Sequence, residues 1–208
     1  MKIEEIIKQK YLYSKKWNLF KFIYFFFQGI KGKKKYRKSY SGSAQDLLVE
    51  HFFKNKSIGV YLDIGCYHPF IGNNTFKLSQ KGWEGINIDI DFHSIELFNN
   101  FRKKDCNIQM GVSESQGVRD LYFFHNRSAI NTLDSNRGKE FNEIRKIKTD
   151  TLNNIIQSTK FRNCKIDFLS IDVEGYEMKV LKGFDFKKYS PDLVVIEYVG
   201  TMDPHKKK

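Results

Sequence analysis

Short apolar runs alternate with stretches of helical spacing along most of this chain. Such runs, bounded by Gly, Pro or Asn, predict buried strands. Five main strands are expected at residues 60–65, 84–90, 106–113, 165–175 and 191–199, and an added strand at residues 118–125. Strands that alternate with helices predict an α/β fold with a mostly parallel sheet and helices on both faces.

Helical patterns fill the intervals between these strands, at residues 45–53, 75–81, 92–103, 151–159 and 176–182. Asp91 stands where it would cap the third of these helices. Asn73 or Asn74 would cap the second, and Gly82 would end it. Residues 126–140 are polar and predict a loop, and loops of that length in compact domains are often functional.

The chain divides near residue 43. Residues 44–208 predict one α/β domain, and residues 1–43 predict a basic, aromatic-rich helical segment. The continuous apolar run of that segment covers only residues 22–27, whereas crossing a bilayer takes ~20 residues. A basic run follows at residues 32–38 without a small-residue cleavage site, so the segment does not resemble a secretory signal.

The net charge of +12 is concentrated in the first 60 residues, which hold 14 Lys or Arg and 4 Asp or Glu. This position argues against nucleic-acid binding by the domain. It favours contact with an anionic membrane surface, where each basic residue contributes about 1 kcal/mol, or a helix packed on the domain. Three scattered cysteines without ligand spacing indicate reduced thiols. We therefore expect a cytoplasmic protein, peripheral at the inner membrane surface if the segment binds lipid.

Polar residues end the first two predicted strands, where open parallel sheets bind ligands. Asp63 and Gly65 end the first, and Asp89 ends the second at the position where a carboxylate could take both hydroxyls of a ribose. The turn after the first strand reads G-C-Y-H-P-F and lacks the G-x-G-x-x-G glycines that hold a pyrophosphate. No P-loop motif occurs either. The sequence favours a ligand without phosphates, as S-adenosylmethionine is.

Three segments, YLDIGCYHPFIGNNTFKLSQKGWEGINIDI, FLSIDVEGYEMKVLKG and PDLVVIEYV, resemble the FkbM family of methyltransferases, and the likeness runs from about residue 40 to residue 199. The resemblance implies a Rossmann-like class I methyltransferase fold, S-adenosylmethionine as the cofactor and O-methylation of a sugar or glycan. It also implies a cofactor pocket lined by Asp63, Gly65, Asn74, Thr75 and Asp89, with Ser113 near the adenine. Many relatives carry Y-S-Q-x-x-E-D, whereas this chain has Y-S-G-S-A-Q-D at residues 40–46.

The fourth main strand ends in acidic residues that we expect to face the acceptor. Asp172 is the first candidate for the base that takes the acceptor proton, and Glu174 is the second catalytic candidate. Glu177 fits either such a role or a helix N-terminus, where negative charge is favourable. An alternative is that Asp172 and Glu197 hold Mg²⁺.

Similar methyltransferases have two further strands after the fifth, and this sequence ends before either. We expect a domain that lacks the last two strands, with residues 193–199 as a bare edge that favours a homodimer. The alternative function is a truncated, weakly active or inactive cofactor-binding remnant at a membrane surface.

Overall fold

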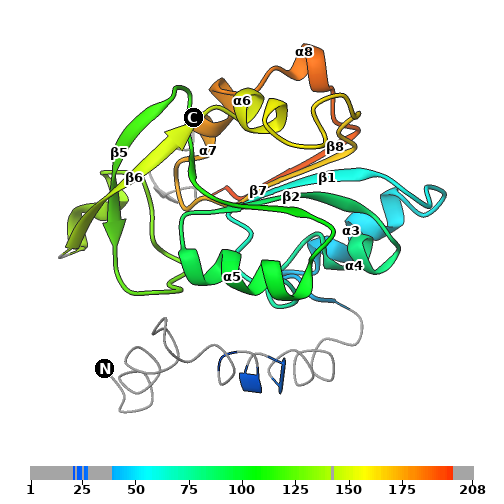
Figure 1. Ribbon diagram of the computed structural model, residues 1–208, viewed down its shortest axis with the longest axis horizontal. Coiled ribbons are helices and arrows are strands. Elements are labelled where there is room, and N and C mark those ends of the chain that lie inside the picture. Colours follow the sequence, from blue (N-terminus) through cyan, green and yellow to red (C-terminus); the bar gives the residue numbers. More distant parts are fainter. Residues whose placement is uncertain (1–20, 22, 25, 28–38, 142, 199–208) are drawn as a thin grey trace, which may run out of the picture.

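A computed structural model describes residues 21, 23, 24, 26, 27, 39–141 and 143–198. Its centre is a five-stranded sheet in the order β3-β2-β1-β7-β8, and all its pairings are parallel (Figure 1). The strands are β1 (Val60–Ile64), β2 (Glu84–Asp89), β3 (Cys106–Gln109), β7 (Phe168–Ile171) and β8 (Leu193–Ile196). The strand order reverses between β1 and β7, which confirms the Rossmann-like α/β fold.

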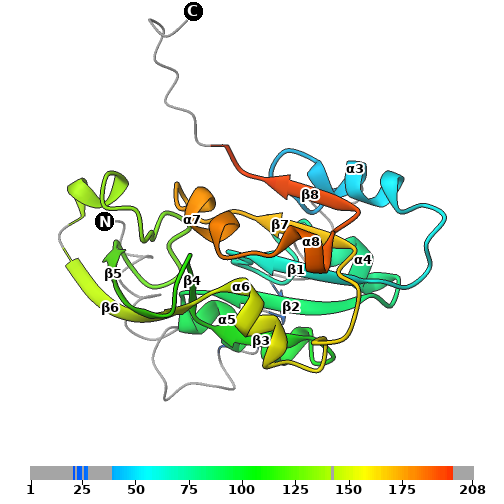
Figure 2. The same ribbon diagram turned by 90° about the horizontal axis from the view of Figure 1, so that it is seen from above.

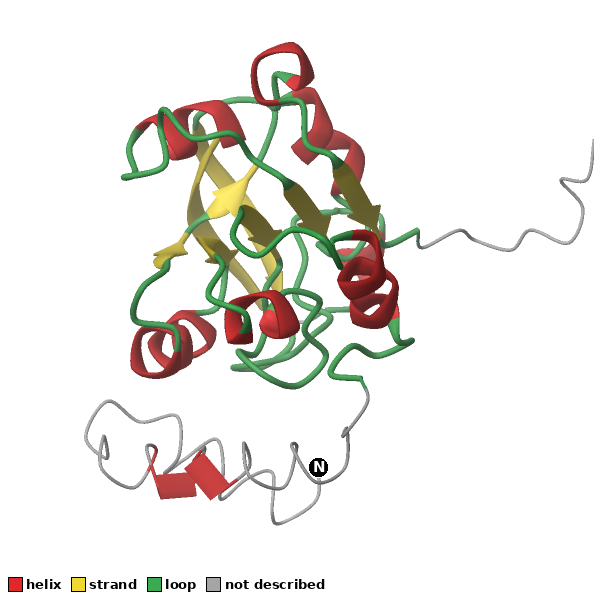
Figure 3. Cartoon of the chain, turned by 90° about the vertical axis from the view of Figure 1, so that its right-hand side faces the viewer, coloured by secondary structure: helices red, strands yellow, loops and turns green. Residues whose placement is uncertain are grey.

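Helices cover both faces of this sheet (Figures 1 and 3). On one face lie α3 (Gln45–Phe52), α4 (Phe76–Gln80) and α5 (Phe92–Phe101), and on the other lie α6 (Leu152–Gln157), α7 (Glu177–Lys182) and α8 (Phe186–Tyr189). No helix in the described part of the chain is long and apolar enough to span a membrane.

Strand β1 contributes to both layers of the core because its side chains alternate between the two faces. Leu62 and Ile64 pack with the α6 residues Leu152, Ile155 and Ile156. Tyr61 packs on the opposite face, in a cluster that includes Phe53 and Trp83. Each fully buried apolar side chain of this kind contributes about 1.5–3 kcal/mol, so the two clusters fix the central strand in register.

A second, three-stranded sheet stands beside the carboxyl ends of the main strands (Figure 2). It contains β4 (Gly111–Val112), β5 (Gly117–Phe123) and β6 (Glu143–Asp150), in the order β4-β6-β5. The single strand predicted at residues 106–113 is therefore wrong. The chain leaves the main sheet after Gln109, and Gly111 pairs with Thr149 of β6.

Helix ends follow the sequence in part. Asp91 caps α5, as predicted, by accepting a hydrogen bond from Ser94 N at 2.9 Å. The expected Asn cap of α4 is wrong, because Thr75 occupies the cap position and Asn73 Oδ1 accepts from Thr75 N instead. Gly82 follows the end of α4 with φ +93°, as expected of a residue that terminates a helix.

Most of the predicted segment at residues 1–43 lies outside the described residues, so its membrane contact stays a prediction. Its described residues between 21 and 27 are helical. Lys21 is buried and its Nζ donates to Glu96 of α5 at 3.0 Å, while Tyr24 packs against Leu97 of the same helix. This part of the segment therefore packs on the domain.

Candidate functional site

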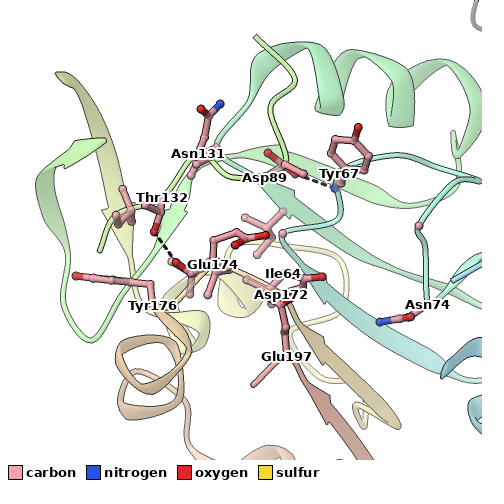
Figure 4. Close-up of a pocket in the computed structure, with 18 of the residues that line it drawn as sticks. Ile64, Tyr67, Asn74, Asp89, Asn131, Thr132, Asp172, Glu174, Tyr176 and Glu197 are labelled. Carbon is pink, nitrogen blue, oxygen red and sulfur yellow. Dashed lines mark hydrogen bonds between the residues drawn. The ribbon is translucent and has the colours of Figure 1, made fainter. Parts of the chain in front are cut away.

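A cavity of about 340 Å³ opens at the carboxyl ends of β1, β2 and β7, next to the point where the strand order reverses. Ligand sites in proteins span roughly 300–1,000 Å³. The walls come from these strand ends, from Gly42, Ser43 and Gln45 around the start of α3, and from residues 128–133, which we call the roof loop. Figure 4 labels Asn131 and Thr132 of this loop. The roof loop lies within the polar loop predicted at residues 126–140.

The structure brings five of the eight predicted site residues to the wall of this one cavity, namely Gly65, Asn74, Asp89, Asp172 and Glu174. The other three, Asp63, Thr75 and Ser113, are buried but are not part of the wall. Asp63 and Thr75 lie behind it and bond to each other, and Ser113 Oγ lies 3.4 Å from the hydroxyl of Tyr176, which does line the cavity. Cofactor binding by all of these residues stays a prediction.

Gly65 is required by a close approach of two strand ends. Its φ is +75°, in the region that favours glycine, and a Cβ at this position would stand 1.7 Å from the carbonyl oxygen of Asp172. The glycine therefore lets β1 and β7 meet at the cavity floor.

Asp89 is held by two backbone donors at the end of β2. Its Oδ2 accepts from Tyr67 N (Figure 4) and its Oδ1 accepts from Asp91 N, both at 2.8 Å. Burial and, less strongly, the charge of Asp91 raise the pKa of Asp89, the two backbone N–H groups oppose the rise, and the resulting pKa is about 7. This carboxyl group therefore changes its charge near neutral pH.

Three carboxylates gather on the other side of the cavity. Oxygen atoms of Asp172, Glu174 and Glu197 all lie within 4.8 Å of one another, a spacing at which they could share one divalent cation. Desolvation within the cavity raises the pKa of Asp172, and the hydrogen bond and charge of Glu197 raise it further. Asp172 thus tends to keep a proton near neutral pH.

Glu174 is held by a sharp turn, by Thr132 of the roof loop and by Arg137, which follows that loop. It has φ +57° and is followed by Gly175 with φ +99°. Thr132 Oγ1 donates to its carbonyl oxygen at 2.8 Å, and Arg137 pairs with its carboxylate at 2.5 Å. Glu177 begins α7 and accepts hydrogen bonds from the N–H groups of Val173 and Gly175, so it has the helix N-terminal role.

The wall of the cavity is acidic although the chain as a whole is basic. Its acidic lining residues are Asp89, Asp172, Glu174 and Glu197, and the described residues of its wall include no Lys, Arg or His. Cations and neutral polar groups are therefore favoured inside it, and anions are disfavoured.

Several wall residues were not predicted from the sequence, including Gln45, Tyr67, Asn131, Thr132 and Tyr176. Two signals pointed to their neighbourhoods. The polar loop at residues 126–140 marked the roof loop, and the family pattern at residues 40–46 marked the segment that carries Gln45. Tyr67 had no such signal; it lies on the wall with φ +52°, and its N–H donates to Asp89 Oδ2.

Comparison with known proteins agrees with this geometry. The family model of the methyltransferase FkbM domain matches residues 63–207. No curated protein and no solved structure matches the chain significantly. The matched region covers well over half of the 208 residues and contains most of the cavity wall. The chain therefore belongs to the FkbM methyltransferase family.

Proposed function

We propose that this methyltransferase uses S-adenosylmethionine to methylate a hydroxyl group of a sugar or glycan. The observation that carries the proposal is the position of Asp89, which ends β2 on the wall of a cavity whose charged side chains are all acidic. A carboxylate at this point of an open α/β sheet is placed to accept hydrogen bonds from the two hydroxyls of a ribose.

The charge of the cavity supports this donor. S-adenosylmethionine supplies a methyl group on a positively charged sulfonium, and the carboxylates of Glu174 and Glu197 would face that charge. A nicotinamide dinucleotide or a nucleoside triphosphate would instead bring phosphates against four carboxylates without a basic residue on the described wall.

The acceptor side supports a hydroxyl-bearing substrate. Ser128, Asn131 and Thr132 place neutral polar residues on the wall beside the carboxylates. Asp172 is the proposed base, because its raised pKa brings it close to the pH at which a base both stays partly ionised and accepts a proton readily. It would take the hydroxyl proton as the acceptor oxygen bonds the methyl carbon and the C–S electron pair stays on sulfur.

A transfer assay tests the proposal. The full chain is incubated with S-adenosylmethionine labelled in the methyl group and with extracts of surface glycans, and label in the glycan fraction is counted. We expect transfer by the unmodified protein and a loss of 10²–10⁴-fold in Asp172→Asn, with donor affinity unchanged within about threefold. Label that enters protein or nucleic acid instead would contradict the glycan acceptor, and absence of donor binding would contradict the whole proposal.

A further inference from the structure

A buried cation lies behind the cavity wall without being part of it. Arg102 directly follows α5, is 4 % exposed and is absent from the described lining residues. An unpaired charge in such a place costs several kcal/mol, so the contacts of its guanidinium indicate what it does.

These contacts reach β1, where Nη2 donates to the hydroxyl of Tyr61 at 2.5 Å, and two separate points of the chain that follows β1. Nη1 donates to the carbonyl oxygen of Pro69 at 3.3 Å, and Nη2 donates to Thr75 Oγ1 at 3.1 Å. Nε pairs with Asp105 Oδ2 at 3.1 Å, which balances the charge. One rigid, planar group therefore ties together residues six positions apart in the loop from Gly65 to Thr75, which we call the wall loop.

Thr75 carries the contact onward to β1. A guanidinium only donates hydrogen bonds, so the Thr75 oxygen must accept from Arg102 and its own proton is left for another partner. That proton points to Asp63 Oδ2 at 2.9 Å or to Asn73 Oδ1 at 3.0 Å. Asn73 Nδ2 also donates to Asp63 Oδ2, at 3.0 Å. Burial raises the pKa of Asp63, while the Thr75 hydrogen bond and the charge of Arg102 oppose that rise.

The wall loop forms one side of the cavity. Gly65, Tyr67 and Asn74 of the wall loop line it. Asn74 is fixed from both sides, because its Nδ2 donates to Ser170 Oγ at 3.0 Å and its Oδ1 accepts from Ser41 Oγ at 2.7 Å. Without the Arg102–Thr75 contact, Pro69 and Thr75 would lose the hydrogen-bonded link that the guanidinium makes between them.

We propose that Arg102 and Thr75 are positioning residues for the methyl donor, which they serve by holding the wall loop in its binding shape through Asp63 and Asn73. This inference rests on the proposed binding of S-adenosylmethionine. If Arg102 and Thr75 had a purely structural role, substituting them would lower the stability of the whole domain. If they are positioning residues, substituting them lowers donor affinity and loosens the wall loop.

Two substitutions at one position separate these roles. Thr75→Val keeps the shape of the side chain and removes the hydroxyl, and Thr75→Ser keeps the hydroxyl. Calorimetric titration with S-adenosylmethionine should show about tenfold weaker binding for Thr75→Val and recovery to within about twofold for Thr75→Ser. Hydrogen exchange should become faster in residues 66–75 of Thr75→Val while β1 and β2 keep their protection.

Thr159→Val is the matched control. Thr159 is also a buried threonine whose hydroxyl makes two hydrogen bonds, to Ile156 O and from Phe161 N, and it lies outside the cavity wall. This variant should lose stability and bind the donor within about twofold of the unmodified protein.

Arg102→Lys supplies a second test, because it keeps the charge that pairs with Asp105 and removes the planar fork. It should weaken donor binding and loosen residues 66–75 in the same way, and combining it with Thr75→Val should add little. Equal donor affinity for Thr75→Val and Thr75→Ser, or fully additive effects of the two substitutions, would overturn the inference. If the unmodified protein binds no donor, the proposed function fails. The hydrogen-exchange rates of residues 66–75 in Thr75→Val and in the unmodified protein would still show whether Arg102 and Thr75 hold the wall loop.

Discussion

Replacing Asp89 by Asn removes the charge at the end of β2 while it keeps the size of the side chain. Asp89 accepts one backbone hydrogen bond on each oxygen, from Tyr67 and Asp91. In Asp89→Asn one of these backbone N–H groups faces the side-chain NH₂ group in place of an oxygen. The hydrogen bond lost there costs about 1–3 kcal/mol of stability. The removal of a buried charge offsets part of that loss. The variant should therefore fold, and its main defect should be in donor binding.

The size of the defect follows from the bonds that Asp89 would make with a ribose. Hydrogen bonds to a charged group contribute about 1.5–3 kcal/mol each, and neutral ones about 0.5–1.5 kcal/mol. If two hydrogen bonds to the charged carboxylate become two neutral ones, the loss of binding free energy is about 3 kcal/mol. This loss raises the Kd roughly 100-fold at pH 8, where the carboxyl group of Asp89 is ionised. With a pKa of about 7, only about a tenth of the carboxyl groups are ionised at pH 6. At pH 6 the unmodified protein therefore binds the donor about tenfold more weakly than at pH 8. The ratio of the Kd of Asp89→Asn to that of the unmodified protein falls from roughly 100 at pH 8 to about 10 at pH 6.

Isothermal titration with S-adenosylmethionine at pH 6, 7 and 8 measures the Kd of each protein and its change with pH. Asp185→Asn is the control, because Asp185 also accepts two backbone hydrogen bonds at the start of a helix but lies outside the cavity wall. Its donor affinity should match that of the unmodified protein at every pH. Binding by Asp89→Asn within threefold of the unmodified protein at pH 8, or a ratio that does not change with pH, would refute the role of Asp89.

Three further predictions concern neighbouring groups. Because the charge of Asp91 raises the pKa of Asp89, Asp91→Asn should move the pH dependence of donor binding below pH 7, and an unchanged midpoint in the same titrations would contradict this. Glu197→Gln removes the charge that helps to raise the pKa of Asp172, so the methyl-transfer rate should begin its rise at lower pH, as initial rates between pH 5 and 9 would show. Gly65→Ala brings a Cβ against the carbonyl of Asp172 at a left-handed φ, so urea denaturation should show a loss of more than about 3 kcal/mol; a smaller loss would mean that the strand ends can separate.

The strands that could be predicted from the sequence are those whose side chains are buried, because burial selects apolar residues. Strands β1, β2 and β7 are buried along nearly their whole length because helices cover both of their faces, and their Leu, Ile and Phe residues marked them in the sequence. Strand β6 was not predicted, because it is largely exposed and has only Ile144 and Ile147 as apolar residues among charged ones. Its position is set by pairing with β5 along seven residues, which no local pattern reports.

The site could be predicted where a residue directly ends a strand of the main sheet. Asp89 and Asp172 were found in this way, because the carboxyl ends of neighbouring parallel strands meet at one edge. Asp63 was expected on the wall but lies behind it, since side chains of β1 alternate and Asp63 shares the face of Tyr61. Asn131 and Thr132 could not be assigned at all, because a bridge between Tyr122 and Thr132 brings them to the cavity.

The strand order has a consequence for the way the protein folds. Strands β1, β2 and β3 are neighbours both in the chain and in the sheet, so this half forms from local contacts. Strand β7 pairs with β1 from more than 100 residues further along, and it brings Asp172 and Glu174 with it. During synthesis the half of the sheet that carries Asp89 is therefore complete while the opposite wall of the cavity has yet to leave the ribosome. The cavity is assembled by a late, long-range docking step, and a chain stopped before β7 would have the wall that carries Asp89 with nothing opposite it.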